Sequence, residues 1–70
     1  MPLNLADMNK TYTILRITGN DQIVRHIAEL GFIPGEEITV LSMVNGDFVV
    51  AVKDSRVAIG RELAKKIIIS

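Results

Sequence analysis

Within the stretch ELGFIPGEEITV, residues Glu29 to Val40, a helical pattern ends and a strand pattern begins. Gly31 suits the left-handed position that ends a helix at low cost. The pair Pro34-Gly35 fits the centre of a type II turn, since Pro presets φ at the first position and Gly tolerates a positive φ at the second. Between these signals stand Phe32 and Ile33. Two large apolar residues at such a junction either fill the core or build a surface for a partner.

The residues before this corner have the periodicity of an amphipathic helix. Asp21 suits an N-cap or first-turn position, where its charge complements the helix dipole. An apolar stripe and a polar face then alternate with helical spacing. The apolar stripe consists of Ile23, Val24, Ile27 and Leu30, and the polar face consists of Gln22, Arg25, His26 and Glu29.

Most of the remaining chain alternates between β-rich segments and turn signals. Asn45-Gly46 is the strongest short hairpin signal. With a two-residue loop it predicts that Met43 faces Phe48, Leu41 faces Val50 and Thr39 faces Val52, whereas a longer loop would shift this register. The predicted strands are residues 10–18, 36–44, 48–53, 56–59 and 66–69, with one helical turn within 60–65.

This order of elements predicts a single domain over residues 1–70. We expect a mainly β fold with one inserted α-helix, in the form of a small Src-homology-3-like five-stranded barrel. Closure of the barrel would protect edges that otherwise promote aggregation. A five-stranded oligonucleotide-binding-type barrel is the topological competitor, although it normally needs a longer chain.

Composition excludes several classes of protein. The chain has no cysteine, so disulfides and thiolate metal sites are ruled out, and 49% hydrophobic residues must supply most of the stability. The formal net charge is zero, which disfavours a nucleic-acid partner. The N-terminal MPLNLADMNK lacks the regions of a signal peptide, and the apolar runs are far too short for membrane insertion. We therefore expect a soluble cytoplasmic protein.

No combination of residues predicts catalysis or a cofactor. His26 is the one histidine, and no serine or threonine is placed beside it by the pattern. Glu36 and Glu37 are neighbours on a predicted strand, so they point to opposite faces and form no acid/base pair. For a metal ion, His26 and Glu29 are weak candidates that supply only two ligands. We expect neither an enzyme nor an intrinsic metal site.

The run RITGNDQIVRHIAELGFIPGEEITVLSMVNGDFVVAVKDSRVAIGRELAKKIII resembles the FeoA family, the small accessory proteins of bacterial ferrous iron transport. The pieces that carry the resemblance are ELGFIPGEEITV, GDFVVAVKDSRVAI and RELAKKIII, preceded by PLNLADM. One departure is Asn9-Lys10, where the family often has a Pro-Gly or similar turn. Because Asn tolerates the left-handed region, we expect the turn to survive.

The resemblance implies a partner, the cytoplasmic GTPase region of the ferrous iron permease, which this protein would regulate or assemble. We predict that Ile33 fills the core and that Phe32 is partly exposed beside the polar helix face; full burial of Phe32 is the alternative. The predicted partner surface is Gln22, Arg25, His26, Glu29 and Phe32.

The sequence leaves two points open, an alternative function and the oligomeric state. The module also resembles the C-terminal domain of metal-dependent repressors. The alternative function is therefore a transition-metal-binding sensor or chaperone. A weak homo-oligomer is also left open.

Overall fold

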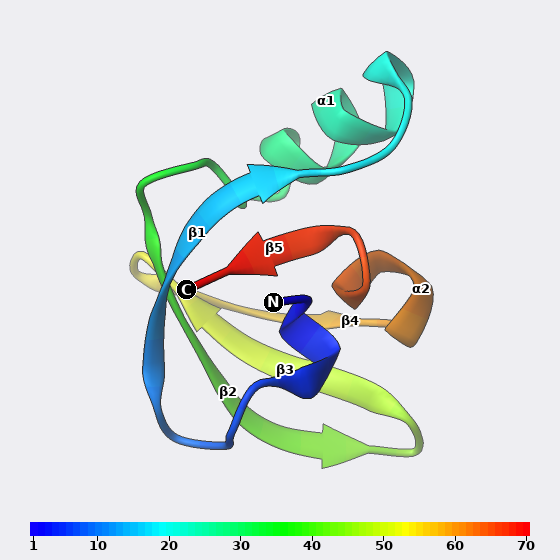
Figure 1. Cartoon of the computed structure of the whole chain (residues 1–70). Coiled ribbons are helices and arrows are strands. Elements are labelled where there is room, and N and C mark those ends of the chain that lie inside the picture. Colours follow the sequence, from blue (N-terminus) through cyan, green and yellow to red (C-terminus); the bar gives the residue numbers. More distant parts are fainter.

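The computed structural model describes residues 1–70 and contains five strands, two α-helices and one 3₁₀ turn (Figure 1). The 3₁₀ turn η1 comes first, one helix follows the first strand, and the second helix precedes the last strand. The elements are η1 (Leu3–Leu5), β1 (Thr11–Ile17), α1 (Asp21–Glu29), β2 (Glu37–Val44), β3 (Asp47–Val52), β4 (Ser55–Ile59), α2 (Arg61–Ala64) and β5 (Ile67–Ile69).

The strands form one antiparallel sheet in the order β4-β3-β2-β1-β5, which confirms the mainly β fold with one inserted helix. β1 pairs with two strands along different parts of its length, and the sheet curves around it. Thr11–Thr13 pair with β2, and Ile14–Ile17 pair with β5. The register of β1 shifts between Ile14 and Arg16, and such bulges bend a strand. β4 and β5 are the two edges and do not pair with each other, so hydrogen bonding does not close the barrel.

The β2–β3 hairpin turns at Asn45-Gly46, as predicted, and both residues have positive φ. Met43 faces Phe48, but the predicted register beyond this pair is wrong. A bulge between Val40 and Ser42 pairs Val40 with Val50 and Thr39 with Ala51. The bulge lets Val40 and Val50 both point into the core, which the uninterrupted alternation could not do.

The core consists of apolar residues only and includes no buried charge. Leu3 belongs to it, so the N-terminal turn closes one side of the barrel. The 14 buried residues are Leu3, Tyr12, Ile14, Ile27, Phe32, Ile38, Val40, Phe48, Val50, Val52, Ile59, Ala64, Ile67 and Ile69.

The corner after α1 has the local geometry that the sequence predicts. Asn20 is the N-cap, since its side chain accepts a hydrogen bond from the Ile23 amide at 2.9 Å, and Asp21 lies in the first turn. At the other end, Gly31 has φ +105° and donates to Ala28 O, while the Phe32 amide donates to Ile27 O. This is the Schellman pattern of helix termination. The Pro34-Gly35 turn follows, with Gly35 at φ +94° and Glu36 N donating to Ile33 O at 3.0 Å.

The predicted roles of Phe32 and Ile33 at this corner are wrong and must be exchanged. Phe32 is fully buried, whereas Ile33 is 42% exposed. The reason is the Schellman pattern, in which the second residue beyond the helix folds back toward the last turn and packs its apolar side chain there. Phe32 occupies that position, and Ile33 instead opens the following turn.

Candidate functional site

The strongest candidate site is a groove between α1 and α2, which lie at one side of the barrel (Figure 1). Its volume is about 390 Å³. α1 contributes one wall, and α2 with the residue that precedes β5 contributes the other. The lining residues are Gln22, Ile23, His26, Glu62, Leu63 and Lys66.

The floor of this α1–α2 groove is apolar and its rim is polar. Ile23 and Leu63 are half-buried, because each packs against the core and still lines the groove. The rim carries both charge signs, with Glu62 and Lys66 on the same wall. Glu62 also forms an exposed ion pair with Lys65 at 3.6 Å, an interaction worth only a few tenths of a kcal/mol.

Backbone contacts fix the second wall relative to the first. Lys66 O accepts hydrogen bonds from Thr18 N at 2.8 Å and from Thr18 Oγ1 at 3.2 Å. Thr18 lies between β1 and α1, so the segment that carries Lys66 is tied to the start of α1. The spacing of the two walls is therefore set by the fold and not by the flexible side chains on the rim.

The structure brings together only part of the predicted partner surface. Gln22 and His26 line the groove. Arg25 and Glu29 are exposed on α1 as predicted, but they lie outside the groove lining. Phe32 is buried and leaves the surface altogether, while Ile33 is exposed at the same corner.

The weak metal candidates His26 and Glu29 gain no further ligands. No group of three or more His, Cys, Asp or Glu side chains in the chain lies close enough to hold a metal ion. His26 shares the groove with Glu62 instead of Glu29. Two side chains remain half of a coordination shell.

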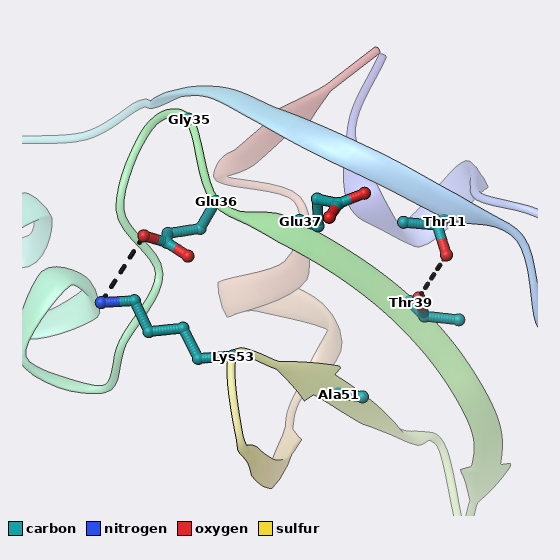
Figure 2. Close-up of a pocket in the computed structure, with 7 residues that line it drawn as sticks. All are labelled: Thr11, Gly35, Glu36, Glu37, Thr39, Ala51 and Lys53. Atoms are coloured by element: carbon teal, nitrogen blue, oxygen red, sulfur yellow. Dashed lines mark hydrogen bonds and ion pairs between the residues drawn. The ribbon is translucent and has the colours of Figure 1, made fainter.

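A second groove, of about 410 Å³, lies over β1, β2 and β3 and has a polar lining (Figure 2). Figure 2 shows the two interactions that cross it: Thr11 Oγ1 and Thr39 Oγ1 lie 3.0 Å apart, and Lys53 Nζ lies 3.5 Å from Glu36 Oε1. Ala51 is its one apolar residue. Because these polar groups already pair with one another across the strands, this groove is a weaker candidate than the α1–α2 groove.

Sequence reasoning missed the residues that α2 contributes to the site. Residues 60–65 were predicted as a helical turn, but a four-residue helix has too little periodicity to show which side faces a neighbour. Glu62, Leu63 and Lys66 therefore carried no signal in the sequence. The burial of Phe32 did carry a signal, namely its position directly after Gly31 and two residues after Leu30, the C-cap of α1.

Comparisons with known proteins agree with this architecture. The family model described as the FeoA domain matches residues 1–70. No curated protein matches the sequence. A crystal structure of an iron uptake regulatory protein (FeoA) is 26% identical, with a TM-score of 0.90 over 99% of this chain and 92% of that one. FeoA of Stenotrophomonas maltophilia, solved in complex with zinc, is 25% identical, with a TM-score of 0.86 over 100% of this chain and 89% of that one.

IdeR of T. acidophilum also shares the fold. The chain is 27% identical to it, with a TM-score of 0.85. The match covers 100% of this chain but only 33% of that one, so the chain spans about a third of IdeR.

The two α-helices, of nine and four residues, are both too short to span a membrane.

Proposed function

Because the chain belongs to the FeoA family, whose members are linked to ferrous iron transport, we propose that it is a cytoplasmic accessory protein of that transport. It binds the cytoplasmic GTPase region of the ferrous iron permease and regulates or assembles the permease. Its action is by contact and not by catalysis.

The α1–α2 groove is the observation that carries this proposal. Protein interfaces combine an apolar centre, which supplies most of the affinity, with a polar rim that supplies specificity. Ile23 and Leu63 form such a centre, and the rim includes Gln22 and His26. The groove thus adds an apolar floor to the polar face of α1, which by itself would give little affinity.

The exposed corner after α1 is a second part of the proposed surface. Ile33 lies four residues beyond the end of α1 and is 42% exposed, although a residue of its size is usually buried. In the proposed complex the permease covers both the groove floor and Ile33. Arg25 and Glu29 then lie at the periphery, where charges affect association rate and salt dependence more than affinity.

The experiment is a titration of the ¹⁵N-labelled protein with the unlabelled cytoplasmic GTPase domain of the permease. We expect the amide signals of Ile23, His26 and Leu63 to shift or broaden first. The variant His26→Ala should weaken binding while the spectrum stays that of the folded protein. Arg56→Ala is the matched control, because Arg56 is an exposed residue on the β4 edge.

The outcome also tests where the partner binds. Signal changes confined to the polar groove over β1, β2 and β3 would contradict the proposed surface. Absence of any binding at high micromolar concentrations of both proteins would contradict the proposed function itself. GTP hydrolysis, measured in the same samples, reports whether the contact stimulates or inhibits the permease.

A transition-metal-binding sensor or chaperone remains the second candidate function. It has one supporting observation, the presence of His26 and Glu62 in one groove. Titration of the protein alone with Zn²⁺ or Fe²⁺ distinguishes the two functions. Saturable shifts around both residues at micromolar metal, lost in His26→Ala, would favour the second candidate over the first.

A further inference from the structure

The first two residues of the chain pair with the outer edge of β5 through an isolated β-bridge. Met1 N donates to Ile69 O at 2.7 Å, and Ile69 N donates to Met1 O at 2.7 Å. Pro2 lies opposite Ile68 in an antiparallel bridge. The outer edge of β5 is therefore paired with the start of the chain's own N-terminal segment, residues 1–8, and the N label lies beside β5 in Figure 1.

One buried side chain anchors the N-terminal segment, and the rest of it is open to solvent. Leu3 is fully buried in the core. In contrast, Met1, Leu5 and Met8 are 46%, 64% and 50% exposed. These are three of the seven large hydrophobic residues that the whole protein exposes, gathered in eight residues of sequence. The N-terminal segment therefore carries three apolar side chains that its own barrel does not cover.

A tight turn connects the N-terminal segment to β1. Asn9 adopts φ +63°, in the left-handed region, which Asn tolerates better than most residues other than Gly. The turn is held by the bond from Asn9 N to Val40 O at 2.7 Å and by the bond from Asp7 N to Tyr12 Oη at 3.0 Å. If the chain straightens at Asn9, the N-terminal segment leaves its own barrel and the left-handed conformation is relieved.

We propose that the N-terminal segment is exchanged between two copies of this chain, which gives a two-fold symmetric dimer. In the dimer, residues 1–3 of each copy pair with β5 of the other through the same backbone bonds and bury Leu3 in the same site. Such an exchange conserves the contacts of the monomer and changes only the hinge. The straightened hinges of the two copies run side by side, so that Leu5 and Met8 gain the apolar cover that they lack in the monomer.

The exchange does not depend on the proposed contact with the permease. η1 touches both β5 and α2. α2 forms one wall of the α1–α2 groove, so each copy would brace this wall in its partner. The dimer is nevertheless measured on the protein alone, so its test needs no permease.

The first test changes the hinge. Asn9→Val disfavours the left-handed conformation, because a β-branched residue tolerates it poorly, and Asn9→Gly is the matched control that retains it. We expect the dimerisation constant of Asn9→Val, measured by light scattering on a sizing column, to exceed that of Asn9→Gly by about tenfold or more. A folded Asn9→Val that stays monomeric at millimolar concentration would overturn the proposal.

The second measurement separates exchange from ordinary association. In a dimer formed from mixed ¹³C-labelled and unlabelled chains, exchange predicts intermolecular contacts between Pro2 of one copy and Ile68 of the other. A dimer without these contacts overturns the proposal. If Asn9→Val does not fold, the unmodified chain is refolded at millimolar concentration. A dimer with the Pro2–Ile68 contact then supports exchange, and its absence refutes it.

Discussion

The inner and outer sides of α1 and of the corner after it differ in their exposure to solvent. The inner side, Ile27 and Phe32, is fully buried, whereas the outer side consists of exposed Ile33 and the polar face Gln22, Arg25, His26 and Glu29. Phe32 and Ile33 are adjacent, equally apolar residues with opposite environments. The geometry in which the helix ends therefore buries one of the two residues in the core and leaves its neighbour exposed to solvent.

The largest expected effect is on the inner side. Phe32→Ala should lower the free energy of unfolding by about 3–5 kcal/mol, because it removes a fully buried aromatic side chain and leaves a cavity. For a 70-residue domain this is much of the total stability. Denaturant unfolding measures the loss, with Phe32→Leu as the milder control. A loss below about 1 kcal/mol would mean that Phe32 does not fill the core.

The next largest effect on stability is expected at Gly31, whose left-handed conformation directs Phe32 into the core. Gly31→Ala should destabilise the protein by about 1–3 kcal/mol, since Gly31 has φ +105°. Space is not the cause, because an added Cβ would meet Val52 Cγ1 at an ordinary 3.8 Å. Gly60→Ala is the control, with a similar contact at 3.8 Å and no positive φ. It should cost only about 0.5 kcal/mol, because Gly60 is the N-cap of α2 and Ala is a poorer N-cap than Gly. Equal thermal stabilities of the two variants would contradict this explanation.

A smaller effect is expected at the start of the helix that carries both sides of the corner. Asn20→Ala removes the N-cap hydrogen bond to Ile23 N and should cost about 1 kcal/mol. Asn20→Asp keeps an acceptor and should stay close to the unmodified protein in thermal unfolding. If both variants lose the same stability, the cap hydrogen bond is not the cause.

On the outer side, stability and binding should separate. Ile33→Ala is expected to change the free energy of unfolding by about 1 kcal/mol at most, because much of the side chain is already in water. Affinity for the GTPase domain of the permease should nevertheless fall, as calorimetric titration would show. Unchanged affinity would remove Ile33 from the partner surface while leaving the α1–α2 groove in place.

The smallest effect on stability is expected for the ion pair between Lys53 and Glu36. Lys53 Nζ and Glu36 Oε1 are 3.5 Å apart, and the Lys53 side chain is 53% exposed. Glu36→Gln should therefore cost less than about 0.5 kcal/mol. This difference should shrink further in 1 M salt. A loss above 1 kcal/mol that persists in high salt would show that Glu36 has a structural role beyond the pair.

Part of the candidate site could be predicted and part could not. The polar face of α1 follows from its spacing, so the exposure of Gln22 and His26 was predictable. The opposite wall was not, because Glu62 and Leu63 lie in a four-residue helix whose orientation depends on what it packs against. The burial of Phe32 is an intermediate case. Once Gly31 is identified as the end of the helix, the Schellman pattern predicts that the following residue, Phe32, packs against the last helical turn.

The order of elements, both ends of α1, the Pro34-Gly35 turn and the Asn45-Gly46 hairpin could be predicted from the residues alone. These features depend on backbone preferences within a few neighbouring residues, and such preferences are intrinsic to Gly, Pro, Asn and the apolar spacing. The bulge near Leu41, the pairing of Met1 with Ile69 and the groove between α1 and α2 became visible only in the folded structure. Each of these three features depends on contacts between elements that are separate in the sequence. Such contacts form only when the whole sheet has curved around one core.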